Sequence, residues 1–353
     1  MNKNNIHTRF SETLLRWYKK EKRKLPFRQT KEPYKVWLSE IILQQTKMNT
    51  GIKYYQKFIK RFPDVVSLAS APQEEVYSLW QGLGYYNRAK NLHKTAKIIS
   101  DKGGVFPNSY AGLIELPGIG KYTASAISSI CFSEKNYVVD ANVYRVLSRV
   151  FGIKTDIKQT KAYGEFLNLT SSLAKTAQKS GDYNEAIMDY GGSVCLVKKP
   201  KCTMCVFKDN CVAKKKNLIA FFPVKAHKNK IKKRSFNYLV FESYDSLLIK
   251  KRNKKDIWEN LYEFYLIEGK KANKTIGKLK KSLGISLLKT IKIKNKAILS
   301  HQKIDVVFNR IILEKKSKII NINKKLKMKM IKKTEIKKFG FPKVIDNYLK
   351  SHS

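Results

Sequence analysis

Apolar residues recur at helical spacing through most of the first 211 residues. Two clear examples are FSETLLRWYKK at 10–20 and YKVWLSEIILQQ at 34–45. Prolines break the region into short segments with short connections, at Pro26, Pro33, Pro63, Pro72, Pro107 and Pro117. The pattern predicts an almost wholly helical N-terminal domain.

The pattern becomes strand-like after Ser235, in the runs 236–243, 246–252 and 303–313, with helical spacing at 274–284 and 341–352. These runs predict a smaller α+β domain. Residues 212–234 hold nine Lys/Arg and no acid, with Pro223 among them, which predicts a surface linker. We therefore expect a helical domain at 1–215, a basic linker at 216–234 and a second domain at 235–353.

Composition and charge narrow the class of protein. A chain of 353 residues with 42% apolar content is large enough for two cores. We expect a soluble, intracellular protein, because no run reaches the roughly 20 apolar residues of a membrane span and the N-terminus has no apolar signal segment. The 73 Lys+Arg against 27 Asp+Glu give a net charge of +46, which favours polyanions such as nucleic acid. Because lysine is abundant everywhere, the charge permits DNA binding without identifying it.

Four of the five cysteines lie within residues 195–211, in CLVKKPKCTMCVFKDNC, with the spacing Cys-x6-Cys-x2-Cys-x5-Cys. Four thiolates this close can hold one compact metal centre, either zinc or an iron–sulfur cluster. Clustered cysteines in a chain without a secretion signal indicate metal ligation before disulfides. The fifth, Cys131, lies in an apolar helical run and is predicted to be a core residue.

The segment LPGIGKYTASAI, residues 116–127, follows a helical run and begins another. Gly118 and Gly120 allow a tight hairpin with positive φ, and the next helix, from about Lys121, presents its N-terminus where a phosphate can bind. The pattern is typical of the helix–hairpin–helix of DNA repair enzymes. An ordinary corner between two helices is the alternative.

Two carboxylates stand out by their setting. Asp140 precedes a helical run whose apolar face includes Val143 and Val146, so it occupies the N-cap position and is expected to stay ionised. Glu40 lies on a helix between Trp37 and Leu43, where lost solvation raises the pKa of a carboxyl group. That would make Glu40 a proton donor near neutral pH, unless it lies on a solvated helix face.

The motifs PYKVWLSE, GLGYY, LPGIGKYTA, VDANV and NEAIMDYGG, followed by the cysteine loop, stand in the order found in one known family. Residues 9–215 resemble the catalytic domain of the MutY adenine DNA glycosylases. The C-terminal part resembles that family's Nudix-like 8-oxoguanine recognition domain more weakly. It lacks the glutamate-rich box of active Nudix hydrolases, so no pyrophosphatase chemistry is expected there.

The resemblance implies a role for each matching residue. Glu40 would protonate adenine N7, and Asp140 would stabilise the oxocarbenium ion, in the family also through a transient covalent adduct. The cysteines would hold a [4Fe–4S] cluster, and other residues would hydrogen-bond the carboxylates, line the adenine pocket or contact the DNA. Those residues are Tyr122 and Asn142 beside the carboxylates; Arg28 in the pocket; Gln45 and Tyr85 as wedges in the base stack; Gln44, Gly118, Gly120 and Lys121 at the DNA; and Ser300 and His301 at the lesion.

The implied substrate is double-stranded DNA carrying adenine opposite 8-oxoguanine or guanine, and we expect a monomer acting in the bacterial cytoplasm at the nucleoid. Two positions depart from the family pattern. Ala141 stands where the family usually has Gly, and Leu299 replaces a Phe in the recognition loop Leu299-Ser300-His301.

Two other functions compete with this one. Endonuclease III-type enzymes use a lysine as a Schiff-base nucleophile, where this chain has Tyr122 beside Lys121. A non-catalytic DNA-binding or electron-transfer protein would not need both Glu40 and Asp140 in matching contexts.

Overall fold

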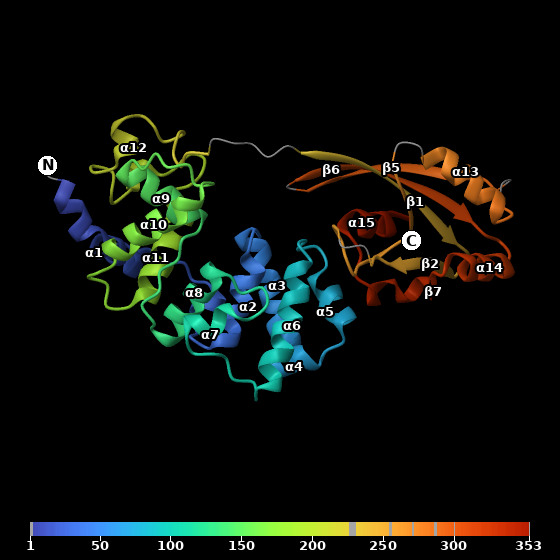
Figure 1. Cartoon of the computed structure of the whole chain (residues 1–353), viewed down its shortest axis with the longest axis horizontal. Coiled ribbons are helices and arrows are strands. Elements are labelled where there is room, and N and C mark those ends of the chain that lie inside the picture. The colour runs from blue at the N-terminus through green and yellow to red at the C-terminus, as the bar shows by residue number, and fades with distance from the viewer. Residues whose placement is uncertain are drawn as a thin grey trace. The chain divides into compact units, whose positions relative to one another are not determined.

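The computed structural model describes residues 3–225, 231–253, 256–269, 272–285, 288–299 and 301–352 (Figure 1). The described residues form two compact units. The first joins residues up to 69 with residues from 94 to the end of the helical region, and the second joins residues 70–93 with the C-terminal part. No helix in these described ranges is both long and apolar enough to cross a bilayer.

The part of the chain up to residue 215 is built from helices, as the apolar spacing predicts. Segments 10–20 and 34–45 fall in α1 and α2, so both helix predictions are confirmed, although α2 already ends at Leu43. The helices are α1 (Lys3–Glu21), η1 (Pro26–Arg28), α2 (Pro33–Leu43), α3 (Met48–Arg61), α4 (Val65–Ser70), α5 (Gln73–Trp80), α6 (Asn87–Asp101), α7 (Tyr110–Ile114), α8 (Lys121–Phe132), α9 (Ala141–Phe151), α10 (Thr160–Leu173), α11 (Ser180–Ser193), η2 (Cys202–Met204) and α12 (Val212–Lys215).

Helix α11 is the centre of the first unit and packs against α1, α8 and α9. Small residues on α11 and α8 let these helices approach closely. A Cβ at Gly181 would lie 2.7 Å from the backbone oxygen of Ser129, so only glycine fits this crossing. Helices α8, α9 and α11 carry most of the polar groups described below.

The C-terminal part forms a mixed seven-stranded sheet with order β3-β2-β1-β6-β5, while β4 also pairs with β1 and β7 with β2. Among the described strands, β1 and β6 are the one parallel pair, with Phe236 opposite Val306. The strand and helix predictions for this part are confirmed. The elements are β1 (Lys232–Glu242), β2 (Ser246–Lys251), β3 (Tyr262–Glu263), β4 (Tyr265–Glu268), α13 (Ala272–Ser282), β5 (Ile291–Ile298), β6 (Gln302–Ile312), α14 (Lys316–Leu326), β7 (Lys329–Lys332), η3 (Lys333–Lys338) and α15 (Lys343–His352).

Apolar side chains cover both faces of this sheet. On one face α15 packs Val344, Ile345 and Tyr348 against strand residues such as Phe308. On the other face, residues of α13 and α14 such as Ile276 and Ile319 pack against the sheet. Strands buried on both faces explain why β1 is a continuous apolar run rather than an alternating one.

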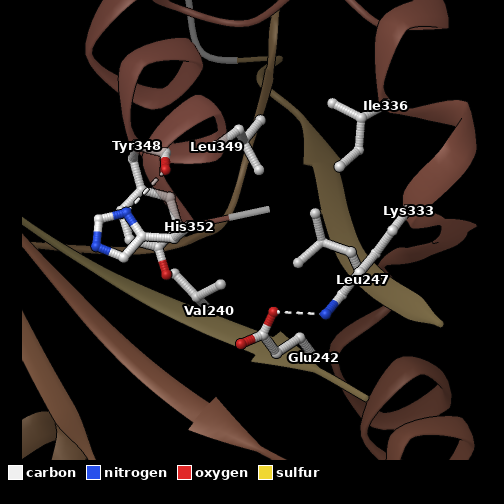
Figure 2. Close-up of a pocket in the computed structure, with 8 residues that line it drawn as sticks. All are labelled: Val240, Glu242, Leu247, Lys333, Ile336, Tyr348, Leu349 and His352. Atoms are coloured by element: carbon white, nitrogen blue, oxygen red, sulfur yellow. Dashed lines mark hydrogen bonds and ion pairs between the residues drawn. The ribbon is translucent and has the colours of Figure 1, made fainter. Parts of the chain in front are cut away.

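A small cavity lies beside α15 in this domain (Figure 2). Its volume is about 10 Å³, and Glu242 and Lys333 form an ion pair of 3.0 Å at its edge. A space of this size holds a single water molecule at most. The cavity is therefore no candidate for binding a nucleotide.

Secondary structure extends into both ends of the basic segment 212–234, of which residues 216–234 were expected to form a linker. Residues 212–215 form α12, and Ala213 is buried with Cys211 and Phe222 in a small cluster. At the other end β1 begins at Lys232, because its backbone pairs with β6 even where its side chains are charged. Pairing through the backbone gives no apolar signal in the sequence. Residues 226–230, within the expected linker, lie outside the described residues.

Candidate active site

Glu40 lies in the middle of α2 and is only 9% exposed, with Val36 and Trp37 of the same helix also buried. Burial raises the pKa of the Glu40 carboxyl group above its ordinary value, and the charge of Asp140 raises it further. Arg28 and a hydrogen bond with Tyr122 act in the opposite direction without cancelling the effect of burial. The setting predicted from the sequence is thus the one found in the structure.

Tyr122, on the first turn of α8, faces Glu40. Its hydroxyl donates to the sulfur of Met188 at 3.0 Å and lies within hydrogen-bonding reach of the Glu40 carboxyl group. Burial and the nearby carboxylates raise the pKa of Tyr122 well above its ordinary value. The phenol therefore stays neutral and can either donate a hydrogen bond to Glu40 or accept one from it.

Asp140 is the N-cap of α9, as the sequence predicts. Its Oδ1 accepts from the backbone N–H groups of Asn142 (2.9 Å) and Val143 (2.8 Å), and its Oδ2 accepts from the Asn142 side-chain amide (2.7 Å). Burial raises the pKa of Asp140, while these three hydrogen bonds and Arg145 lower it. Ala141 begins the helix, so the residue that replaces the family's glycine adopts a backbone open to any side chain.

The Asn142 side chain is held from the opposite side by Arg145. The guanidinium donates to Asn142 Oδ1 (2.7 Å), to the Gly191 backbone oxygen (2.7 Å) and to the Cys195 backbone oxygen (2.7 Å). A Cβ at Gly191 would lie 2.6 Å from the Asn142 Cβ, so α11 leaves just enough room for this amide. The result is an Asn142 amide with one orientation, aimed at Asp140.

Arg28, expected in the adenine pocket, lies close enough to Glu40 for its charge to lower the Glu40 pKa. Three further charged residues that the sequence analysis missed lie beside Arg28. Arg28 forms an ion pair with Glu185 (2.5 Å), and fully buried Asp189 binds Arg23 (2.5 Å) and lies 3.6 Å from Arg28. Tyr18 adds a hydrogen bond to Glu185 at 2.8 Å. Glu185 and Asp189 belong to the NEAIMDYGG motif, which was recognised without a role for its acids.

These groups open onto a groove of about 760 Å³ in the first unit. Its walls include Tyr18, Arg23, Arg28 and Glu185, and lysines such as Lys22 and Lys179 lie at its rim. Glu40, Tyr122 and Asp140 are not among the residues that line this groove, but the charges of two lining residues, Arg28 and Glu185, act on the Glu40 carboxyl group.

The hairpin at 116–120 has the expected positive φ at Gly118 (+80°) but not at Gly120, whose φ is −92°. The prediction for Gly120 was therefore wrong: it is the extended N-cap of α8, and a Cβ at this position would meet no atom within 4 Å. Open space at a helix N-cap lets another molecule approach the backbone N–H groups of the first turn closely. Lys121 is exposed beside it, with its ammonium 5.1 Å from the Tyr163 ring.

Gln45 and Tyr85, the expected wedges, are both exposed and both have positive φ, +55° and +50°. A positive φ is uncommon for residues other than glycine, and residues that adopt it are often found in functional loops. Gln44 differs from its neighbour: its side chain donates to Thr123 Oγ1 at 3.3 Å and ties α2 to α8. DNA contact by these three residues stays a prediction.

The four cysteines of the loop lie close enough to affect one another. Burial raises the pKa values of Cys205 and Cys211, and neighbouring thiols of the loop raise them further. The Tyr190 hydroxyl lies 2.9 Å from the Cys205 sulfur, and Arg149 lies 3.5 Å from that of Cys195. Within the described ranges, no group of three or more acidic, His or Cys side chains has ligating geometry.

Cys131, near the end of α8, is half-buried rather than the core residue expected, and burial raises the pKa of its thiol to about 12. In the C-terminal domain, Leu299 packs against the core beside α15, and its backbone N–H binds Gln302 at 2.8 Å in a tight turn. His301 is exposed at the start of β6. Ser300 lies outside the described residues, so its expected role is a prediction only.

Comparison with known proteins identifies the families to which the two parts of the chain are similar. Residues 38–171 match the family model of the HhH-GPD superfamily of base excision DNA repair proteins, and residues 237–351 match that of the NUDIX domain. The chain is 41% identical over 260 residues to the adenine DNA glycosylase of Buchnera aphidicola subsp. Baizongia pistaciae, a match covering 72% of this chain and 73% of that relative.

Two solved structures share the helical fold. A thermostable thymine-DNA glycosylase matches with a TM-score of 0.55 at 29% identity, covering 60% of this chain and 98% of its own. A trapped endonuclease III–DNA covalent intermediate matches with a TM-score of 0.52 at 21% identity, covering 62% and 99%. The fold is that of a helix–hairpin–helix DNA glycosylase, a class that acts in base excision repair. Within that class, the chain belongs to the adenine DNA glycosylase family.

Proposed function

We propose that this enzyme binds double-stranded DNA and removes adenine mispaired with 8-oxoguanine or guanine, with Glu40 as general acid and Asp140 as the charge that stabilises the sugar. The observation that carries the proposal is the difference between the two carboxyl groups. Glu40 is buried beside the neutral Tyr122 phenol, whose oxygen can accept a hydrogen bond from the protonated Glu40 carboxyl group. Asp140 instead accepts hydrogen bonds at both of its oxygens.

The reaction follows from these two settings. The target adenine must leave the base stack, at a cost of a few kcal/mol. As the C1′–N9 bond breaks, its electron pair moves onto the base and the Glu40 proton passes to N7. The negative Asp140 stabilises the cationic sugar until water adds to C1′ and loses a proton. We place the flipped base against Glu40, near Arg28 and Glu185, whose charges act on the Glu40 carboxyl group.

A single-turnover excision assay tests this function. Duplexes with adenine opposite 8-oxoguanine, guanine or thymine should give alkali-labile sites in the first two and none in the third. Because Tyr122 occupies the position of the lyase lysine, little strand cleavage should appear without alkali. Release of an oxidised pyrimidine with equal nicking in the absence of alkali would assign the chain to the endonuclease III type.

We also infer that Ser300 and His301 read the lesion. A serine hydroxyl can donate to O8 of 8-oxoguanine or accept from its N7–H, the two places where that base differs from guanine. The double variant Ser300→Ala, His301→Ala should lower the preference for adenine opposite 8-oxoguanine over adenine opposite guanine. Excision opposite guanine should change little. An equal loss on both substrates would assign the loop to folding or general DNA affinity.

The cysteine loop suits a [4Fe–4S] cluster held by Cys195, Cys202, Cys205 and Cys211. The donor set fits, because all four ligands are thiols. Arg149 lies beside the Cys195 sulfur, Tyr190 donates a hydrogen bond to the Cys205 sulfur, and Arg145 donates to the Cys195 backbone oxygen. With four protein ligands and no open position, such a cluster would serve as a structural clamp.

Metal analysis of the purified protein separates the two candidate centres. Iron and acid-labile sulfide in stoichiometric amounts, with brown visible absorption, would support the cluster. Cys202→Ser should remove most of this absorption, while Cys131→Ser should leave it unchanged. Stoichiometric zinc without iron would show that the assignment is wrong.

A further inference from the structure

Residues 70–93 belong to the same compact unit as the C-terminal part of the chain, and they contact the turn Phe339–Pro342. This turn lies between η3 and α15. The Tyr86 hydroxyl donates to the Phe341 backbone oxygen at 3.2 Å, and the Ser78 hydroxyl donates to that of Lys337 at 3.0 Å. Two side chains of the α5–α6 region are thus bonded to the backbone of a segment about 255 residues later.

Close packing and ion pairs extend the same contact. A Cβ at Gly340 would lie 3.3 Å from the Tyr77 Cβ and 3.5 Å from Leu261, which leaves little room for a larger residue. Ion pairs join Lys251 to Glu74 and Lys90 to Glu259, both at 3.4 Å. Tyr86 is only 7% exposed and packs edge-on against Tyr77. Its hydroxyl therefore bonds in a place from which water is largely excluded.

The residue next to Tyr86 is Tyr85, which is 45% exposed. The loop that carries it is held in an unusual conformation, with φ of +102° at Gly82, +71° at Gly84 and +50° at Tyr85. From the last residue of α5, the Trp80 indole N–H donates to the Gly84 backbone oxygen at 3.0 Å. The Arg88 guanidinium donates to the same oxygen at 3.3 Å and lies 5.5 Å from the Tyr85 ring.

An exposed aromatic ring on a strained backbone keeps its direction only if both ends of the loop are fixed. Trp80 and Arg88 fix the loop internally, and the bond from Tyr86 to Phe341 fixes the residue that directly follows Tyr85. Since peptide geometry links adjacent residues, a shift of Tyr86 turns the Tyr85 backbone.

We propose that the Phe339–Pro342 turn is a positioning element for Tyr85, acting through Tyr86. This deepens the proposed function, because it rests on the role of Tyr85 as a wedge in the DNA stack. The C-terminal domain then contributes to mispair recognition twice: through its own lesion loop, and by presenting the Tyr85 ring in the direction needed to enter the stack. Tyr86 is the positioning residue, and Tyr85 is the residue that touches DNA.

A double-mutant cycle on Tyr86→Phe and Tyr85→Ala tests this directly. Tyr86→Phe removes one hydroxyl and keeps the ring against Tyr77. Tyr244→Phe, at a 99% exposed tyrosine in the same domain, is the matched control. The readouts are the ratio of affinities for an adenine:8-oxoguanine duplex and an undamaged duplex, and the fluorescence of 2-aminopurine placed beside the 8-oxoguanine.

In the otherwise unchanged protein, Tyr86→Phe should lower the affinity ratio about three- to tenfold, the range set by the net value of one hydrogen bond. It should also reduce the fluorescence change caused by base unstacking. In the Tyr85→Ala background the same change should have no further effect on either readout. The excision rate at saturating enzyme should stay close to that of Tyr244→Phe.

Equal effects of Tyr86→Phe in both backgrounds would show that the contact only stabilises the fold, and a ratio unchanged in the Tyr85-containing protein would also overturn the proposal. A second variant, Gly340→Val, pushes the turn away from Tyr77 and should reproduce the loss, with Gly277→Val as control because a Cβ there would meet no atom within 4 Å. If the wild-type protein excised no adenine, the proposed function would fail, while the fluorescence cycle would still report the coupling.

Discussion

Glu40 in α2 and Asp140 at the start of α9 are both carboxyl groups whose pKa is raised by burial, yet their partners differ in kind. Glu40 faces the Tyr122 hydroxyl, which can donate or accept a hydrogen bond. Asp140 faces two backbone N–H groups, which can only donate, and an amide fixed by Arg145. A proton on Asp140 would break one of these bonds, whereas a proton on Glu40 can be shared with Tyr122.

Burial alone therefore does not assign acid and base roles. Both carboxyl groups lose solvation, and the freedom of their hydrogen-bond partners decides which one holds a proton and which one holds a charge.

Glu40→Gln removes the proton donor and keeps the shape. The adenine excision rate at saturating enzyme should fall by about 10²- to 10⁴-fold, the usual share of general acid catalysis, while affinity for the mispaired duplex stays within a few-fold of wild type. Glu32→Gln, at the exposed start of the same helix, is the control and should excise normally. Excision by Glu40→Gln within tenfold of wild type would remove Glu40 from the mechanism.

Asp140→Asn removes the negative charge while leaving a residue that caps a helix equally well. The excision rate should fall by about 10²- to 10³-fold, as expected for the loss of one electrostatic contact to a transition state. The thermal midpoint should change little. Asp64→Asn, at an exposed capping carboxylate whose Oδ1 accepts from Ser67, controls for the substitution itself. A large drop in stability without a specific rate loss would make Asp140 a cap and nothing more.

Gly191→Ala tests the hydrogen bond that the Asn142 side-chain amide donates to Asp140. The new Cβ would meet Asn142 at 2.6 Å and push its amide away from Asp140, which should lower the excision rate about tenfold through the loss of one charged hydrogen bond. Gly164→Ala places a Cβ in open space on α10 and should be neutral. If Gly191→Ala excised adenine at the control rate, the Asn142 amide would not matter to Asp140.

The sequence predicted the parts of this site that depend on local pattern. The apolar spacing placed Glu40 on a buried helix, and the apolar face of α9 placed Asp140 at its N-cap. It did not reveal the ion pairs of Arg23 and Arg28 with Glu185 and Asp189, because these residues lie far apart in the chain and only the packing of α1 against α11 brings them together.

The same limit applies to the hairpin and to the loop that carries Tyr85. Glycine composition predicts freedom at both Gly118 and Gly120, but only the fold decides which of them uses positive φ. Tyr86 carries no local signal of its contact with Phe341, since that bond depends on where the C-terminal domain folds. The lesion loop was predicted from resemblance alone, and Ser300 lies outside the described residues.

The most direct test of the central claim is the single-turnover excision rate of the wild-type enzyme and of Glu40→Gln across pH. Glu40 acts when protonated and its pKa is raised, so the wild-type rate should fall as pH rises through that value. Asp140 acts when ionised, so the rate should also fall as pH drops through its own pKa. The residual rate of Glu40→Gln should lose the decline at high pH and keep the decline at low pH. A wild-type rate that kept rising with pH, or a high-pH decline retained in Glu40→Gln, would contradict the assignment of Glu40 as the acid.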